Sequence, residues 1–539
     1  TGEGKTLTGS IAAALLSWQH RSLHIFTVND YLAKRDAESR SPIYKRCLIE
    51  VGSIQQEHDP TMRAEIYAKG IVYGTPKQIT ADYLRDQIRL GQLNNAWAGR
   101  QQFILRGGQG GGGPLVPGLR AALVDEADAV MIDEGVVPLI IARSRQDDAL
   151  TEVYRTAKRL AEKLDEGPDY KVDSLRRKAE LKRRGEHRLD QMLDDIGDAG
   201  GDPIWRATRR AEELVKQALV ARHCYKHGQQ YHIVDGQVVI VDESTGRFLA
   251  DRSWEHGLHQ AVEAKEGLEI TADRETLARM SFQRFFRSYP FLSGMTGTAA
   301  DATGEIEKVY SRPVVVIPTN RPVIRITKRT RVFRSEQAKW AAIVESIDEV
   351  NRGGQPVLVG TRSIEASEYL SEKLTNRGIT HTVLNALHDE EEADLIASAG
   401  RGTSGGQMPA VTVATNMAGR GTDIIPDEAA IKAGGLHVIL TEMHGSKRID
   451  RQFIGRSGRQ GDPGSSQVFV SLEDEIIHQH APALAASLAG TTPGEELTGH
   501  PLAARLFRTA QKRAEAFARR NRDGVLKQDD WIDKYLPGG

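Results

Sequence analysis

Short apolar runs alternate with helical patterns along residues 1–144, and this alternation predicts the first folded domain. The runs that we interpret as strands are Leu23–Val28, Ile71–Tyr73 and Ala121–Asp125. Strands that alternate with helices are typical of a doubly wound α/β domain with a parallel sheet. We therefore expect the chain to begin with such a domain.

A second set of strand-like runs recurs between residues 322 and 475. Its members are Pro356–Gly360, Thr380–Leu384, Val411–Ala414, Leu436–Leu440 and Val468–Ser471. Helical stretches separate these runs, so the pattern predicts a second parallel-sheet domain.

The segment between these two patterns has a different character. Residues 145–252 are rich in charged residues and helical patterns, and they end in a predicted β-hairpin with its turn at Asp235-Gly236. We interpret them as an inserted α+β domain, after which residues 253–321 complete the first domain. At the other end, residues 476–539 are predicted to be a helical segment that contains a basic, alanine-rich helix over Pro501–Arg522.

Composition and charge narrow the class of protein. A chain of 539 residues is expected to form roughly three to four domains. The net charge of −1 argues against a nucleic-acid partner, because such binders usually carry a basic excess. The two cysteines show no metal-ligand or disulfide spacing, which favours a reducing cytoplasm. No apolar stretch approaches the ~20 residues that span a bilayer, so we expect any membrane role to be peripheral.

The first residues match the end of a phosphate-binding loop. Gly2 and Gly4 precede Lys5 and Thr6, and a helical run follows. In such loops, backbone N–H groups at the helix start hold phosphate oxygens, the lysine reaches the β- and γ-phosphates, and the hydroxyl binds Mg²⁺. A chance match at a helix start is the alternative. Since the strand that normally precedes this loop is absent, we expect the chain to be a fragment.

Two further motifs belong to the first domain. Asp125 and Glu126 end an apolar strand, where an aspartate can hold Mg²⁺ through water and a glutamate can orient or deprotonate the attacking water. An acidic turn of no catalytic role is the alternative. The small polar residues of Ser293–Thr298 favour a flexible loop between domains that senses nucleotide state.

The second domain carries two glycine-rich motifs with arginines, Ala414–Asp423 and Gln452–Asp462. In the second motif, the spacing of Arg456 and Arg459 predicts two guanidinium groups about one helical turn apart. Arginines presented across a domain cleft can neutralise charge on a γ-phosphate, an effect worth roughly 10³–10⁵ in rate. Structural salt bridges are the alternative for each arginine taken singly.

The chain resembles the SecA family of superfamily-two helicase-type motors. The resemblance covers residues 1 to about 475. It rests on the two arginine motifs and on the strings Thr27–Asp36, Asp82–Asp86, Gly257–Gly267, Pro318–Pro322 and Gly354–Thr361. It implies an ATPase that drives protein translocation, with two RecA-like motor domains, and it identifies the insertion with the preprotein-crosslinking domain.

The resemblance also implies the roles of individual residues. Gly2, Gly4, Lys5 and Thr6 would bind ATP, Asp125 would hold Mg²⁺ together with Thr6, and Glu126 would activate water. The second motor domain would complete the site with Arg420, Asp423, Arg456 and Arg459. The implied partners are unfolded preproteins, a SecY-type membrane channel and an anionic membrane surface. The resemblance is also compatible with a homodimer. The implied location is the cytoplasmic face of the inner membrane.

The sequence departs from the family pattern in several places. A glycine-rich insert lies at 107–113, Gly135 lies in a stretch where the family usually has an arginine, and Ile454 replaces another arginine. The helical region at the end is also short. This short helical region is expected if the C-terminus is cut or if the chain is a reduced, accessory SecA-like motor. Two other functions stay open as alternatives, namely a nucleic-acid helicase of the same superfamily and a SecA-like polypeptide-binding protein that does not hydrolyse ATP.

Overall fold

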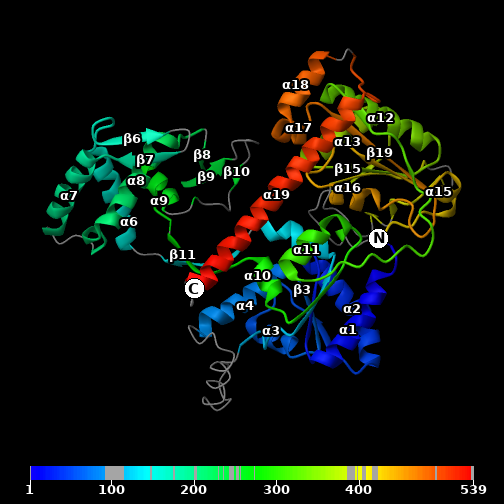
Figure 1. Cartoon of the computed structure of the whole chain (residues 1–539), viewed down its shortest axis with the longest axis horizontal. Coiled ribbons are helices and arrows are strands. Elements are labelled where there is room, and N and C mark those ends of the chain that lie inside the picture. The colour runs from blue at the N-terminus through cyan, green and yellow to red at the C-terminus, as the bar shows by residue number, and fades with distance from the viewer. Residues whose placement is uncertain are drawn as a thin grey trace. The chain divides into compact units, whose positions relative to one another are not determined.

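The computed structural model describes two compact units. Unit 1 consists of Thr1–Ile140 and Ala278–Gly539, and unit 2 consists of Ile141–Leu277 (Figure 1). The described residues run from 2 to 535, apart from 91–113, 137, 146–147, 174–176, 199–202, 229, 235, 242–247, 250–253, 255–256, 272, 385–394, 397, 404–407, 416–422 and 492–493.

The first sheet of unit 1 is five-stranded and parallel, with the order β12-β4-β1-β3-β2. Its strands are β1 (Leu23–Phe26), β2 (Val51–Ser53), β3 (Ile71–Gly74), β4 (Ala121–Asp125) and β12 (Phe291–Met295). The helices of this motor domain are α1 (Lys5–His20), α2 (Asp30–Arg46), α3 (Pro60–Tyr67), α4 (Pro76–Leu90), α10 (Phe282–Arg287) and α11 (Thr303–Tyr310). β1 and β3 are buried along their whole length, and accordingly their sequences are mainly apolar, with His24 as the polar residue of β1.

An aromatic cluster helps to form the core of this domain. The rings of Phe26 and Phe286 lie 5.0 Å apart at 80°, and those of Phe285 and Tyr289 lie 5.5 Å apart at 89°. Edge-to-face pairs of this kind add to the stabilisation that burial provides. His24 joins the cluster through Nδ1, which lies 2.6 Å from the Tyr289 hydroxyl, and burial lowers the pKa of His24 to about 4. The cluster therefore keeps a neutral imidazole inside the domain.

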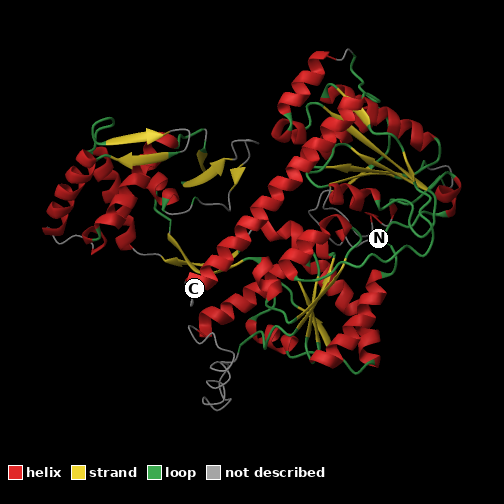
Figure 2. Cartoon of the chain, in the orientation of Figure 1, coloured by secondary structure: helices red, strands yellow, loops and turns green. Residues whose placement is uncertain are grey.

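The second sheet of unit 1 is also parallel and has seven strands. The order is β13-β19-β18-β15-β17-β16, and β14 pairs with β19. The strands are β13 (Ile326–Thr327), β14 (Arg331–Phe333), β15 (Val357–Thr361), β16 (Thr382–Leu384), β17 (Val411–Thr415), β18 (Leu436–Leu440) and β19 (Gly464–Ser471). Helices α12 (Glu336–Arg352), α13 (Ile364–Asn376), α15 (Glu428–Lys432) and α16 (Lys447–Ile454) belong to this motor domain (Figure 1). Figure 2 shows that the strands of the sheet lie among helices. The predicted α/β class with two RecA-like parallel sheets is confirmed.

Three helices follow the second sheet, namely α17 (Glu475–His480), α18 (Pro482–Thr491) and α19 (Pro501–Tyr535). The predicted helix over Pro501–Arg522 is present and continues to Tyr535. Its first half buries Leu506, Phe507 and Ala510 in a core shared with α17, α18 and the second motor domain. Its second half reaches the first motor domain, where Arg522 donates to both carboxylate oxygens of Glu305 at 2.6 and 2.9 Å. One helix therefore contacts both motor domains.

Unit 2 has its own core. Its elements are α6 (Asp148–Glu162), β6 (Tyr170–Asp173), β7 (Lys178–Leu181), α7 (Arg183–Asp198), α8 (Thr208–Cys224), β8 (Tyr231–Val234), β9 (Gln237–Val241), β10 (Phe248–Leu249) and α9 (Leu258–Glu266). The predicted hairpin is present as β8 and β9, paired antiparallel, while Asp235 of its turn lies outside the described residues. The strands β5 (Leu139–Arg145) and β11 (Asp273–Met280) form a separate two-stranded sheet.

The bounds of unit 2 differ from the range predicted for the insertion, 145–252. The unit continues to Leu277. Helix α9 contributes Ala261, Val262 and Ala264 to the same core as α6 and α8, and Leu268 and Ile270 pack against this core. Lys265 also donates to the Tyr225 carbonyl at 2.7 Å and contacts the Tyr231 hydroxyl at 2.9 Å. Part of the Gly257–Gly267 string thus serves to hold α9 in this unit.

None of the described helices combines the length and the hydropathy that a membrane crossing requires.

The aromatic cluster gives a first test of the fold. We expect Phe286→Ala to destabilise unit 1 by about 3–5 kcal/mol, because it removes a fully buried ring and leaves a cavity. Phe517→Ala is the matched control, since that ring is 57% exposed. Denaturant unfolding followed by circular dichroism measures both. Equal stability of the two variants would contradict the cluster's role in the core.

Candidate functional site

Helix α1 starts in a way that leaves its first backbone N–H groups available. Gly4 precedes it with φ 76°, a left-handed conformation that favours glycine, and no described side chain caps the helix. Gly2 has φ 80° as well. A helix start with open N–H groups attracts anions, and phosphate groups in particular. The local backbone therefore has the features of a phosphate-binding loop.

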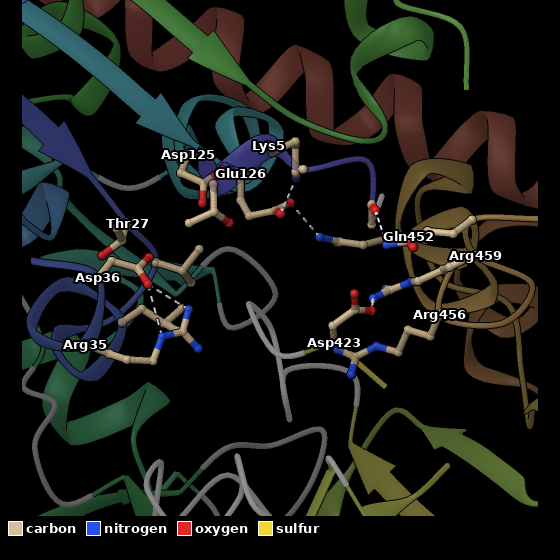
Figure 3. A pocket seen from close by; sticks show the side chains of 16 residues that line it. Lys5, Thr27, Arg35, Asp36, Asp125, Glu126, Asp423, Gln452, Arg456 and Arg459 are labelled. Atoms are coloured by element: carbon tan, nitrogen blue, oxygen red, sulfur yellow. Dashed lines mark hydrogen bonds and ion pairs between the residues drawn. The ribbon is translucent and has the colours of Figure 1, made fainter. Parts of the chain in front are cut away.

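A polar cavity of about 270 Å³ lies at this helix start and is lined by both motor domains of unit 1 (Figure 3). The lining residues of the first domain are Gly2, Gly4, Lys5, Thr6, Thr27, Val28, Leu32, Arg35, Asp36, Asp125 and Glu126, and those of the second are Asp423, Gln452, Arg456, Arg459 and Gln460. All the predicted site residues except Arg420 line this cavity, and Arg420 lies outside the described residues.

The two acidic residues follow directly from strand β4. Asp125 is its last residue, and its Oδ1 accepts a hydrogen bond from the Glu126 amide at 2.9 Å. Burial raises the pKa of Asp125 to about 6, although the Lys5 ammonium acts in the opposite direction. Glu126 has φ 47°, a left-handed conformation that costs a non-glycine residue about 1–2 kcal/mol. Backbone strain of this kind concentrates at functional sites.

Glu126 connects the two walls of the cavity. Lys5 donates to its Oε1 at 2.5 Å, and Gln452 of the second motor domain donates to its Oε2 at 3.2 Å. The pair with Lys5 is part-buried, with 21% and 17% of the two side chains exposed. A phosphate arriving at α1 would compete with Glu126 for the lysine. The carboxylate would then be free to accept a proton or a hydrogen bond from water.

The two motif arginines lie beyond the end of α16, which stops at Ile454. The prediction that one helical turn separates them is wrong, because Gly455 caps the helix and Gly458 takes a left-handed φ of 61°. Arg456 is buried, with its guanidinium 5.5 Å from the centre of the Phe453 ring. Arg459 forms an ion pair with Asp423. A tight loop thus brings both arginines into the cavity.

The arginine loop also contacts the phosphate-loop segment. Gln460 donates to the Gly2 carbonyl at 3.0 Å. A Cβ added at Gly2 would lie 3.0 Å from Cδ of Arg459. The absence of a side chain at Gly2 therefore permits this close approach between the two domains.

A buried ionic network joins the motor domains beside the cavity. Arg448 of α16 donates to Oδ2 of Asp128 at 2.6 Å and also pairs with Asp133. Asp128 precedes a short π-helix, Ala129–Asp133, and Asp133 is its last residue. Burial alone would raise the pKa of Asp128, but Arg448 and two threonine hydroxyls outweigh it and lower the pKa. Neither Arg448 nor Asp133 stood out in the sequence, because only the folded chain brings them together.

The two threonines come from the segment Ser293–Thr298, which is not the flexible loop that its composition suggests. Ser293–Met295 complete strand β12, which pairs with β4. Thr296 and Thr298 then each donate to Asp128 at 2.6 Å. The segment is held in place because each hydroxyl satisfies a buried carboxylate oxygen.

Sequence reasoning missed five polar residues of the cavity, namely Thr27, Arg35, Asp36, Gln452 and Gln460. Of these, Thr27 follows β1 directly, and Arg35 and Asp36 lie on the helix after it. The signal for them was available, since ligands of parallel α/β sheets bind beyond the carboxyl ends of the strands. Arg35 donates to Asp36 at 2.9 and 3.0 Å, which orients its guanidinium at the cavity (Figure 3).

Two RecA-like domains that share a polar cavity, with an open helix start on one wall and arginines on the other, define a two-domain nucleotide-binding motor. The SecA DEAD-like domain matches residues 1–307, and the SecA P-loop domain matches residues 322–431 and 426–490. The chain belongs to the SecA family.

Curated relatives match almost the whole chain. Protein translocase subunit SecA 2 of Chlorobium chlorochromatii is 40% identical over 548 residues, covering 99% of this chain and 80% of that protein. Protein translocase subunit SecA 2 of Bordetella avium is 42% identical over 538 residues, covering 99% and 79%. Protein translocase subunit SecA of Carboxydothermus hydrogenoformans is 40% identical over 576 residues, covering 99% and 62%.

The Arg448 network gives a test of how the motor domains are joined. We expect Arg448→Ala to destabilise unit 1 by about 3–5 kcal/mol, because it leaves a buried carboxylate without its charged partner. Arg451→Ala is the control on the same helix. It removes an exposed pair with Asp301 and should cost less than about 1 kcal/mol.

The stability difference between wild type and Arg448→Ala should depend on pH. Because the folded pKa of Asp128 is lowered, its pair contributes stability above the ordinary carboxyl pKa of about 4 and loses it as the pH falls through the folded value. Urea unfolding at several pH values measures this. A difference that grows toward acid pH would contradict the assignment.

Proposed function

We propose that the chain is an ATP-driven motor that moves unfolded preproteins through a SecY-type membrane channel. The observation that carries the proposal is the cavity shared by the two motor domains, with Lys5 and Glu126 on one wall and Arg456 and Arg459 on the other. The relatives' printed names, protein translocase subunits, supply the substrate class.

ATP binds with its phosphates at the start of α1. Lys5 binds the β- and γ-phosphates, and the backbone N–H groups after Gly2 and Gly4 hold phosphate oxygens. Asp423 and Arg420 contribute from the second motor domain. The uncapped helix start and the two left-handed glycines support these assignments.

The cavity also suits Mg²⁺, because the Asp125 carboxylate and the Thr6 hydroxyl are hard oxygen donors on its lining. Both residues would hold the ion, directly or through water. When bound, Mg²⁺ neutralises charge on the β- and γ-phosphates.

Hydrolysis uses residues from both walls. Lys5 pairs with the incoming phosphate in place of Glu126, and Glu126 then accepts a proton or a hydrogen bond from the attacking water. Gln452 keeps the glutamate oriented through its other oxygen, 3.2 Å away. Arg456 and Arg459 neutralise the charge that develops on the γ-phosphate. Because the arginines belong to the second motor domain, turnover requires the cleft to be closed.

Unit 2 binds the polypeptide. Strand β8 is at the edge of its three-stranded sheet, with Ile233 and Val234 partly exposed. An extended chain of any sequence can pair with an open strand edge through its backbone. Cycles of cleft closure would then move the bound polypeptide, and the motor would work at an anionic membrane surface on the cytoplasmic side.

The role of Glu126 can be tested directly. We expect Glu126→Gln to abolish ATP hydrolysis while ATP affinity changes less than about threefold, because the amide still accepts hydrogen bonds but takes up no proton. Glu428→Gln, at a fully solvated surface position, is the control. Phosphate release and fluorescent-nucleotide binding measure the two properties. Hydrolysis retained by Glu126→Gln would remove the proposed base.

The arginine of the second motor domain gives an independent test. We expect Arg456→Ala to slow hydrolysis at least roughly tenfold, a floor below the usual effect of an arginine finger. The exposed Arg505→Ala serves as control. A rate within twofold of wild type would show that Arg456 is not used in this way.

A further inference from the structure

The short helix α16 carries functional groups on one side and is anchored on its other side by α19. Arg448 and Gln452 point to the first motor domain, and the helix ends two residues before Arg456. A small rotation or shift of α16 would move all three groups together. The contacts that hold α16 in place therefore affect the geometry of the cavity.

Asp450, on the same helix, is bonded on the α19 side. Its Oδ1 accepts hydrogen bonds from the His444 amide at 3.0 Å and contacts His444 Nδ1 at 2.7 Å. Its Oδ2 accepts from Nε2 of Gln511, on α19, at 2.7 Å. The same Gln511 nitrogen donates to the His444 carbonyl at 3.0 Å. One buried amide thus uses both of its donor hydrogens on α16 and the loop before it.

A second α19 residue bonds the start of α16. Oε1 of Glu515 accepts from the Lys447 amide at 2.9 Å and from the Ser446 hydroxyl at 3.4 Å. A carboxylate at a helix N-terminus is favoured by the helix dipole and by the open N–H groups. Gln511 and Glu515 lie one turn apart on α19 and therefore share one face of it.

Helix α19 is itself held in place by apolar packing. Ala503, Leu506, Phe507, Ala510 and Ala514 on this helix are all buried in the core shared with α17, α18 and the second motor domain. Displacing the helix would expose this apolar surface to water. The position of α19 is thus transmitted to α16 through two side chains.

We propose that Gln511 and Glu515 are positioning residues of the ATPase. They fix the position and orientation of α16 and so hold Gln452 and Arg456 at the nucleotide. Neither Gln511 nor Glu515 contacts the nucleotide itself. This inference rests on the proposed ATPase function. It adds that the long helix controls turnover through a defined pair of contacts, rather than through its general packing.

The test uses Gln511→Met, which keeps the volume of the side chain and removes both donated hydrogen bonds. We expect kcat to fall about tenfold, as the loss of these two hydrogen bonds implies, while KM for ATP stays within twofold. Thr509→Ala, at a half-buried position of the same helix whose hydroxyl donates within α19 to the Arg505 carbonyl, should change neither. Hydrogen exchange of the amides over 447–454 should become faster in Gln511→Met and should be unchanged in Thr509→Ala.

Glu515 gives a second pair of variants that does not depend on the first. Glu515→Gln retains an acceptor for the Lys447 amide and should keep kcat within about threefold of wild type, whereas Glu515→Ala should lower it about tenfold. Equal rates for these two variants, or unchanged exchange over 447–454 in Gln511→Met, would overturn the proposal. If the wild-type chain hydrolysed no ATP while the exchange effect was present, the proposed function would fail and the positioning contacts would stand.

Discussion

The arrangement of unit 1 depends on one buried guanidinium. Arg448 leaves the second motor domain and ends between Asp128 and Asp133 of the first. A buried charge is costly unless it is fully paired, so the pairing of Arg448 favours the spacing of the two domains that is seen in this structure. That spacing also sets the distance from Gln452 to Glu126 and brings the arginine loop to Gly2. The geometry of the cavity therefore depends on this contact.

The polar residues around the cavity also form linked pairs. Lys5 contacts Glu126, Glu126 contacts Gln452, and Thr296 and Thr298 hold Asp128 for Arg448. A ligand that takes Lys5 away from Glu126 alters a group that the second domain also contacts. A ligand that binds to the first motor domain is therefore expected to change the contacts of the second. A motor that couples hydrolysis to domain movement requires such a link.

The sequence predicted the architecture well, because strands buried on both faces of a parallel sheet are continuous apolar runs. β1, β3, β4 and β15 were all located in this way. β2 and β12 were missed, since the first has only three residues and the second contains Ser293 and Gly294. The phosphate-loop, acidic and arginine motifs could be recognised because each is local. Arg448 and Asp133 could not, because they are 315 residues apart and meet only across the domain boundary.

The most direct test of the account is the rate of ATP hydrolysis with and without an unfolded secretory polypeptide, and separately with single-stranded RNA. A motor of this family that acts on preproteins should be stimulated by the polypeptide and left unchanged by RNA. Stimulation by RNA alone would contradict the account and would favour a helicase built on the same two sheets.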